Sequence, residues 1–216
     1  MSAGAPHDVV NTGELPFPCV VVDLETTGLD PSTCRIIQMA ALVVEPSGQV
    51  SQTFSTVVKP EQPAEYEHGA EHIHGISADD VSRGMALSHA LDHLLSLLPL
   101  GTFAGHNASF DLGFLHAEAE RLGRIFPVIE HIDTLAVSRR SDPEKLRSHR
   151  LSELCVHHDI VLDGAHTALG DATATAQLLS ALLREAEIIT PDQLPLVVSE
   201  YRAKTCLLYT SDAADE

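Results

Sequence analysis

The sequence predicts an α/β fold in which helices flank one mixed β-sheet. Short runs of β-branched and apolar residues, bounded by Gly, Pro and Ser, have the length and composition of strands. Leucines and alanines that recur every three or four residues predict amphipathic helices elsewhere in the chain. Three strands come first, and helices then alternate with two further strands. This order predicts a five-stranded mixed sheet covered by helices.

The strands are predicted from apolar runs and from the turns between them. Val20-Val21-Val22 is a β-branched run typical of a buried strand. Turn-forming residues at 29–32 separate it from the second strand, and a Pro-Ser-Gly turn at 46–48 precedes the third. The predicted strands are Cys19–Val22, Arg35–Glu45, Val50–Val58, Thr102–Gly105 and Val128–Ile132.

The helices are predicted from periodicity and from capping residues. Ser77 and Asp80 have the spacing of a capping box, which predicts that a helix begins there. Asn107 is expected to cap a helix that runs to about Leu122. The longer predicted helices are 86–98, 107–122, 151–158, 168–187 and 191–204.

Length and composition indicate the domain organisation. The 216 residues and the hydrophobic content of 44% fit one domain with a sizeable core. We expect a flexible segment over residues 1–16, the main domain over 17–187 and a helical segment over 188–205. Residues 206–216 look like the translation of a sequencing-library adapter, so we exclude them from fold reasoning.

We expect a cytoplasmic protein that does not contact membranes. Residues 1–14 lack the basic and apolar stretches of a signal peptide, and no apolar run approaches the ~20 residues that span a bilayer. The four cysteines show no C-x-x-C spacing, which favours reduced thiols.

Acidic residues dominate the chain, whose formal net charge of −18 is unusual for a protein that binds nucleic acid. The basic residues are unevenly distributed, because residues 139–150, which we call the basic segment, contain five of them. These are Arg139, Arg140, Lys145, Arg147 and Arg150. Either the segment meets phosphates locally, or it is a solvated loop that Asp142 and Glu144 partly neutralise.

An acidic motif directly after the first predicted strand indicates a metal site. Asp23 and Glu25 occupy alternate positions of an extended chain, so their side chains project from the same side. Two carboxylates so close together repel each other unless a cation lies between them. Oxygen ligands favour Mg²⁺ or Mn²⁺ as that cation. A calcium loop is one alternative, but its twelfth position, which needs Glu, is Cys34. Two solvated carboxylates at a strand end are the other alternative.

Two further acids begin predicted helices and lie on the core-facing rows of those helices. Asp111 aligns with Leu115 and Ala119 on the core-facing row. An acid in this position either pairs with another side chain or coordinates a metal ion. The alternative is that it only interacts with the helix dipole. Asp171 follows the same pattern, and His166 lies five residues before it on a Gly-rich loop. An imidazole there can take a proton from a water near neutral pH. Taken alone, each position also fits an ordinary helix cap or a surface histidine.

Together these motifs resemble those of the DEDDh family, the DnaQ-like 3′→5′ exonucleases, which include the proofreading epsilon subunit of bacterial DNA polymerase III. The three motifs are Asp23-x-Glu25, Asn107-x-x-Phe110-Asp111 and His166-x-x-x-x-Asp171. The resemblance extends over about residues 17–185 and includes connecting signatures at 72–76, 132–135 and 151–155. It implies a ribonuclease H-like fold with a five-stranded mixed sheet, and it makes 17–187 an exonuclease domain.

The resemblance also implies a hydrolytic site with two Mg²⁺ or Mn²⁺ ions. Asp23 would bridge the ions, and Glu25 and Asp171 would complete the site of one of them. Asp111 would hold the second ion largely through water, and His166 would be the general base. The residues implied to contact the terminal nucleotide or the strand are Thr26, Gly28, Leu29, Ile73, Ile76, Asn107 and Phe110.

We therefore expect a metal-dependent exonuclease that releases nucleoside 5′-monophosphates from the 3′ end of single-stranded DNA. It would be free-standing or bound to a DNA polymerase catalytic subunit, as in proofreading. An exoribonuclease that trims short RNA or tRNA 3′ ends is an alternative, because the sequence does not distinguish DNA from RNA. A catalytically silent scaffold is the alternative of a different class, although all four acids and the histidine are present.

Overall fold

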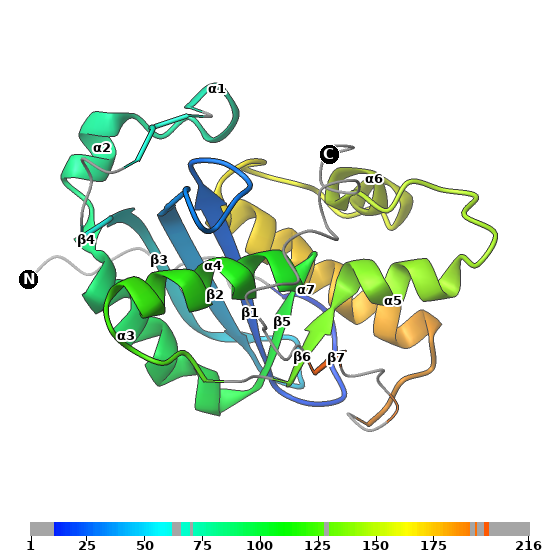
Figure 1. The fold of residues 1–216 in the computed structure, drawn as a ribbon. Helices are drawn as coiled ribbons and strands as arrows, with labels where there is room; N and C mark the ends of the chain where they lie inside the picture. The colour runs from blue at the N-terminus through cyan, green and yellow to red at the C-terminus, as the bar shows by residue number, and fades with distance from the viewer. Residues whose placement is uncertain are drawn as a thin grey trace, which may run out of the picture.

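One β-sheet runs through the molecule, and helices pack on both of its faces (Figure 1). The computed structural model describes residues 11–61, 66–69, 71–127, 130–190, 193 and 197–198. Within these residues the strand order is β4-β3-β2-β1-β5-β6-β7, so β1 lies in the middle. The strands are β1 (Cys19–Thr26), β2 (Ile36–Val44), β3 (Val50–Lys59), β4 (Met85–Ala86), β5 (Thr102–Gly105), β6 (Glu130–Asp133) and β7 (Val197–Val198).

β1 joins the antiparallel and the parallel parts of the sheet. It pairs antiparallel with β2, with Glu25 opposite Gln38, and it pairs parallel with β5. β2 and β3 form an antiparallel hairpin, and β5 pairs parallel with β6. The predicted α/β fold with a mixed sheet is confirmed, and the five predicted strands are all present.

Three details of the sheet differ from the prediction. β1 extends to Thr26 rather than ending at Val22, because the residues of its acidic motif stay paired with β2. The two-residue strands β4 and β7 add to the two edges of the sheet and are too short to show a period. β7 corrects the predicted helix over 191–204, since residues 197–198 pair antiparallel with β6. Of the remainder of that range, only Gln193 is described.

The predicted helices between residues 77 and 187 are present, together with α5, which was not predicted. α5 is short, and its start depends on the Asp133 carboxylate, which accepts the N–H of Leu135. The capping box of Ser77 and Asp80 is confirmed at the start of α2. The helices are α1 (Glu71–His74), α2 (Ala78–Ser82), α3 (Leu87–Leu97), α4 (Ala108–Arg121), α5 (Thr134–Ser141), α6 (Leu151–His157) and α7 (Ala168–Glu185), with a 3₁₀ turn, η2, at Leu98–Leu100.

The two sides of β1 contribute to two separate cores. Val20, Val22 and Leu24 pack with residues of α3 and α4, whereas Cys19 and Val21 pack with residues of α7. This alternation follows from the two-residue period of a strand. β1 is therefore covered on both faces, which is why its sequence is almost continuously apolar up to the acidic motif.

Part of the N-terminal segment contacts the rest of the domain. Of residues 1–16, for which we expect a flexible segment, the structure describes residues 11–16. The N–H of Thr12 donates to the carbonyl of Gly48 at 2.9 Å, and Leu15 is buried in the core beneath α7. An apolar side chain placed just before β1 thus anchors this part of the chain.

The remaining expectations concern the chain ends, the cysteines and membranes. Residues 1–10 and the suspected adapter segment 206–216 lie outside the described residues. Cys19, Cys34 and Cys155 are free thiols, as predicted. Among the described residues, no helix combines the length and the apolar composition needed to cross a membrane.

Candidate active site

Three of the predicted acids meet at one end of β1. Asp23 and Glu25 share the side of β1 that packs against α7, and Asp171 lies in the first turn of α7. One carboxylate oxygen from each acid lies within 4.8 Å of those of the other two. The arrangement follows from the strand period, which puts both strand acids on one side, and from the packing of α7 across that side.

Burial and repulsion make these acids hard to ionise together. Burial raises the pKa of Glu25 to about 7, and the charge of Asp171 adds to this effect. Burial also raises the pKa of Asp171, although the charge and the backbone N–H of His166 lower it in part. A divalent cation would remove the repulsion, and a set of carboxylate oxygens suits Mg²⁺ or Mn²⁺. The acids therefore fit a metal site of the kind that the sequence predicts.

Asp111 approaches the same place from the first turn of α4. Asp111 is only 4% exposed, and burial raises the pKa of its carboxyl well above the usual range. The charges of Asp133 and Glu25 raise this pKa further, whereas a hydrogen bond from the backbone N–H of Leu24 lowers it. Asp111 is thus a neighbour of the strand acids, although its oxygens are not among those that lie within 4.8 Å of one another.

His166 lies on the turn before α7, beside Asp171. The turn is tight, because Thr167 Oγ1 donates to the carbonyl of Gly164 at 2.6 Å and accepts the N–H of Gly170 at 3.1 Å. His166 has a φ of 61°, a left-handed conformation that costs a residue with a Cβ about 1 kcal/mol. Its backbone N–H hydrogen-bonds the Asp171 carboxylate, and its side chain is exposed. The turn therefore holds the backbone of His166 and leaves the ring accessible.

Asp133 is a residue of this region whose role the sequence analysis missed. Its carboxylate accepts the N–H groups of Asn107 and Leu135, both at 3.0 Å, and so ties the start of α4 to the start of α5. Asn107 occupies the predicted N-cap position of α4, but its φ is 60° and its side chain makes no capping hydrogen bond. Phe110, in the first turn of α4, packs half-buried against the core. The overlooked signal is an acid directly after a strand, which also identified Asp23.

The residues implied to contact the terminal nucleotide differ in exposure. Thr26 Oγ1 donates to the carbonyl of Gly28 at 2.8 Å, which shapes the loop after β1. Leu29 on this loop is 62% exposed, and Ile73 on α1 is 51% exposed. Ile76 is only 8% exposed and belongs to a small core cluster. Leu29 and Ile73 are therefore the apolar side chains that a ligand can reach.

The far end of α4 holds the loop that carries Leu29. Arg121 donates to the carbonyl of Ser32 at 2.9 Å and pairs with Glu118 at 3.3 Å. Glu118 is 1% exposed and also accepts the N–H of Ile36 at 3.3 Å. Burial raises the pKa of Glu118, and the charge of Arg121 lowers it in part. The first turn of α4 thus positions Asp111, and the last turn of α4 positions the loop that carries Leu29.

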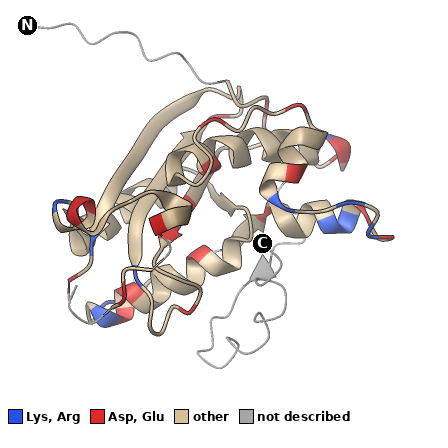
Figure 2. Ribbon diagram, turned by 90° about the horizontal axis from the view of Figure 1, so that it is seen from above, with Lys and Arg blue, Asp and Glu red and all other residues tan. Residues whose placement is uncertain are grey.

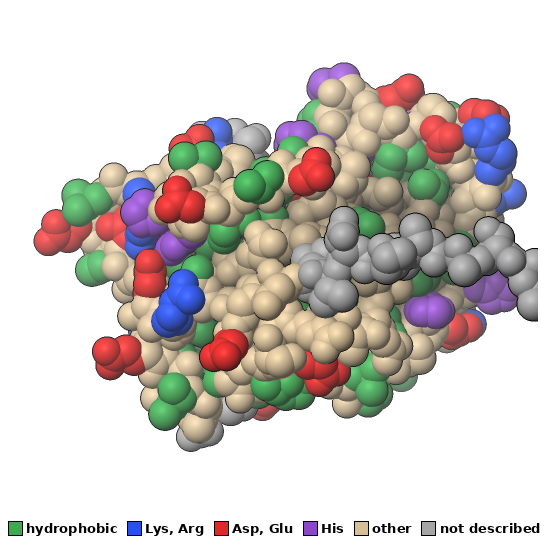
Figure 3. All heavy atoms as spheres, turned by 180° about the vertical axis from the view of Figure 1, so that it is seen from behind, with side chains coloured by type: hydrophobic (Ala, Val, Ile, Leu, Met, Phe, Trp, Pro, Cys, Tyr) green, Lys and Arg blue, Asp and Glu red, His purple; other side chains and the backbone are tan. Residues whose placement is uncertain are grey.

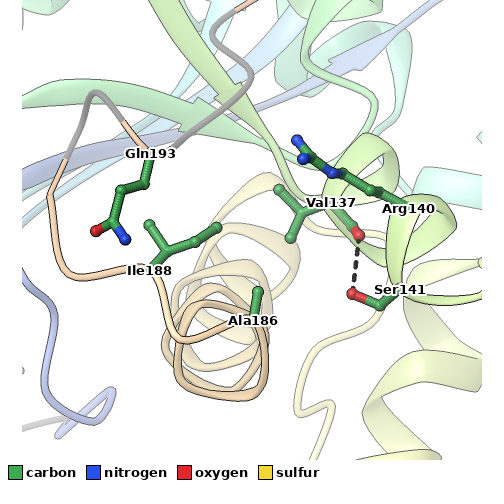
Figure 4. A pocket seen from close by; sticks show the side chains of 6 residues that line it. All are labelled: Val137, Arg140, Ser141, Ala186, Ile188 and Gln193. Carbon is green, nitrogen blue, oxygen red and sulfur yellow. Dashed lines mark hydrogen bonds between the residues drawn. The ribbon is translucent and has the colours of Figure 1, made fainter.

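A pocket of about 280 Å³ lies elsewhere, between α5 and the turn after α7 (Figure 4). None of the predicted site residues lines it, so we assign it no part in the chemistry. Its lining residues are Val137, Arg140, Ser141, Ala186, Ile188 and Gln193.

Comparison with known proteins gives a family match over most of the chain. The family model RNase_T, described as Exonuclease, matches residues 20–179. A DNA polymerase III PolC-type protein of Halalkalibacterium halodurans is 33% identical over 178 residues, which are 81% of this chain and 12% of that protein. The 3′-5′ exonuclease DinG of Bacillus subtilis is 33% identical over 169 residues, which are 77% of this chain and 18% of that protein. The chain therefore spans less than a fifth of either relative.

Solved structures share the fold. Exonuclease I of E. coli, in complex with a dT13 oligonucleotide, has a TM-score of 0.67 and 22% identity over 77% of this chain and 41% of its own. The nuclease domain of 3′hExo, a DEDDh family member bound to rAMP, has a TM-score of 0.67 and 17% identity over 78% of this chain and 92% of its own. These similarities confirm the ribonuclease H-like fold class.

The raised pKa of Glu25 makes the stability of the metal-free protein depend on pH. Folding raises this pKa to about 7, so between about pH 5 and 7 the folded state keeps a proton that the unfolded state has released. The free energy of unfolding should therefore fall as the pH rises through this range. Thermal unfolding in EDTA at several pH values measures the fall, and added Mn²⁺ should reverse much of it above about pH 7.

The matched variant is Glu25→Gln, which keeps the size of the side chain but cannot ionise. Its melting temperature in EDTA should fall less than that of the wild type over the same pH range. The same pH dependence in both proteins would show that Glu25 is not the responsible group.

Removal of Arg121 alone from its pair with Glu118 should destabilise the protein strongly. Arg121→Met would leave a buried carboxylate without its cationic partner, which costs on the order of 3 kcal/mol. Denaturant unfolding measures the loss, and the double variant Glu118→Gln with Arg121→Met should recover part of it. A loss below about 1 kcal/mol, typical of an exposed ion pair, would contradict the importance of this contact.

Proposed function

The chain belongs to the DEDDh family of 3′→5′ exonucleases, and we propose that it removes nucleotides from the 3′ end of single-stranded DNA. The observation that carries the proposal is the gathering of Asp23, Glu25 and Asp171 within 4.8 Å at the end of the central strand. Asp111 lies next to them on α4, and His166 lies on the turn before α7. All five positions of the family pattern are thus occupied by the expected residue types.

The acids are proposed to hold two Mg²⁺ or Mn²⁺ ions, in line with the family resemblance. Asp23, Glu25 and Asp171 would hold one ion, because their oxygens already face one another. Asp23 and Asp111 would hold the other. When bound, the ions supply positive charge that stabilises the attacking and the leaving oxygens of phosphodiester hydrolysis.

His166 is proposed as the general base. Its exposed ring lies beside Asp171, where it can accept a proton from the water that attacks the terminal phosphodiester. A bond forms between the water oxygen and phosphorus, and the bond between phosphorus and the 3′ oxygen of the preceding nucleotide breaks. That 3′ oxygen takes a proton from solvent, and a nucleoside 5′-monophosphate leaves.

Contacts to the terminal nucleotide are proposed to be independent of base identity. Leu29 and Ile73 expose apolar side chains, which can pack on any base. Ile76 is buried and would support this surface from below. The proposed substrate contacts are Thr26, Gly28, Leu29, Ile73, Ile76, Asn107 and Phe110.

Support for DNA as the substrate comes from the relatives, which are a DNA polymerase and a 3′-5′ exonuclease at 33% identity. The solved structures include one with a DNA oligonucleotide and one with rAMP, at 22% and 17% identity. An exoribonuclease that trims short RNA or tRNA 3′ ends is therefore the second candidate, and the assay below separates the two.

Proofreading is a finer form of the proposal. The region matched in the PolC-type relative is 12% of a DNA polymerase III protein, and in a proofreading role this domain would act together with a polymerase catalytic subunit. Co-purification with that subunit and excision of a mispaired 3′ terminus would support this role. Digestion of free single strands without any polymerase binding would favour a free-standing enzyme.

The purified protein with Mn²⁺ should shorten a DNA oligonucleotide from its 3′ end and should degrade RNA of the same sequence more slowly. Denaturing gels of 5′-labelled strands measure both rates. Asp171→Asn keeps the shape of the side chain but removes its charge, and it should abolish the release of nucleotides. Faster cleavage of RNA would support the second candidate, and no cleavage of either strand would overturn the proposal.

His166→Ala should lower kcat by about 10²- to 10⁴-fold, which is the usual contribution of a positioned general base. Binding of Mn²⁺, followed by titration calorimetry, should persist because the acids are unchanged. His89→Ala is the control, since His89 is exposed on α3 and should be dispensable. Unchanged turnover in His166→Ala would exclude this residue as the base.

A further inference from the structure

The basic segment concentrates positive charge in a strongly acidic protein. The chain has 13 Lys and Arg against 31 Asp and Glu, and five of the 13 lie in residues 139–150. The segment comprises the end of α5, the loop after it and the residue before α6. Figure 2 shows Lys and Arg along this stretch, and Figure 3 shows basic and histidine side chains at the same end of the molecule, with acidic side chains among them. Such a local concentration of charge attracts a polyanion even when the net charge opposes it.

The loop in this segment has a defined shape. The carboxylate of Asp142, which is buried, accepts the N–H groups of Leu146 and Arg147 at 3.0 and 3.1 Å. His149 Nδ1 is hydrogen-bonded to Ser138 Oγ at 2.8 Å, and its Nε2 lies 3.3 Å from Asp142 Oδ2. The loop is therefore fastened to α5, and its basic side chains project from a fixed frame.

The same frame is connected to the start of α4. His106 directly precedes Asn107, and its Nδ1 is hydrogen-bonded to Thr134 Oγ1 at 2.9 Å. Burial lowers the pKa of His106 to about 4, and the charges of Arg139 and His149 lower it further. Arg139 and His149 therefore lie close to the turn from which α4 carries its acid into the site.

The helix that follows the segment also borders the site. Burial raises the pKa of Cys155 on α6 to about 11, and the charge of Asp171 raises it further. α6 is thus within electrostatic reach of the acids on one side, while α5 is tied to α4 on the other. The basic segment connects two elements that both lie beside the active site.

Several charges of the segment are not neutralised by the protein itself. Arg140, Lys145 and Arg150 are exposed, and none of them pairs with a carboxylate among the described residues. Arg83 and Arg124, in contrast, pair with carboxylates of α2 and α3 at 2.6 and 2.7 Å. Arg140 also lines the pocket of Figure 4, which leaves Lys145 and Arg150 as the clearest candidates to meet an external anion.

We propose that the basic segment binds phosphates of the nucleic-acid strand upstream of the terminal nucleotide and so guides the strand into the active site. The inference rests on the proposed function, because it is the nuclease substrate that supplies the polyanion. Contacts of this kind position a strand without reading its sequence, and they weaken as salt is added. They would also offset the repulsion between the strand and the acidic remainder of the protein.

The test uses two double variants. The first variant carries both Lys145→Gln and Arg150→Gln, and the control variant carries both Arg83→Gln and Arg124→Gln. Both variants lose two positive charges, but the control loses them from arginines that are already paired. Equal melting temperatures within a few degrees would confirm that both fold. Binding of a fluorescent 16-nucleotide DNA strand is measured by anisotropy in an Asp171→Asn background, so that binding does not depend on turnover.

The first variant should bind the 16-nucleotide strand about three- to tenfold more weakly than the wild type at low salt. Its plot of log Kd against log salt should be shallower by about 1.4, because each phosphate contact of a single strand contributes about 0.7. With Asp171 present, its KM for the 16-nucleotide strand should rise, while cleavage of a dinucleotide should not change. The control variant should match the wild type in all of these measurements.

An unchanged Kd and an unchanged salt dependence in the first variant would overturn the inference. This is also the result expected if the segment binds an acidic protein instead of DNA. An equal loss on the dinucleotide would also overturn it, because the charges would then act at the active site itself. If the wild type cleaves no nucleic acid but the first variant still binds the 16-nucleotide strand more weakly, the proposed function fails and the binding role of the segment stands.

Discussion

The burial of carboxylates close to one another is the constraint on which the rest of this structure depends. Glu25, Asp171 and Asp111 are each harder to ionise in the folded protein than in water, chiefly because they are buried. Each is attached to an element that cannot easily move away, namely the central strand and the first turns of two helices. The positive ends of those helices relieve part of the repulsion. The remainder is best relieved by divalent cations, so the fold that brings the acids together also determines what they bind.

The mixed sheet provides the rigidity that this arrangement needs. β1 is hydrogen-bonded to a neighbour on both edges and packed on both faces, so its acids have fixed positions. Buried polar residues then fasten the surrounding segments. Asp133 joins the starts of α4 and α5, and Glu118 with Arg121 holds the loop that carries Leu29. Asp133, Glu118 and Arg121 therefore hold the segments around the site in place, in addition to any contribution to stability.

An acidic protein that acts on a polyanion needs its positive charge in the right place rather than in large amount. Repulsion from distant acids is screened beyond about 8–10 Å at physiological salt, so charges near the strand path dominate. The metal ions would act on the scissile phosphate, and the basic segment would act on phosphates further along the strand. The net charge of −18 is then compatible with nucleic-acid binding, because acids far from the strand are screened by salt.

The sequence by itself determined the five main strands, the principal helices and the family, because these depend on local periodicity and on motifs of fixed spacing. The side that Asp23 and Glu25 share follows from the strand period alone. Only the tertiary structure decided that Asp171 comes within 4.8 Å of them, that Asp133 ties α4 to α5 and that Ile76 is buried. It also gave the N-cap residue Asn107 a left-handed conformation without the expected side-chain hydrogen bond, and it put β7 in part of an expected helix. These features depend on contacts between segments far apart in the chain, and such contacts arise from packing, which leaves no periodic signal in the sequence.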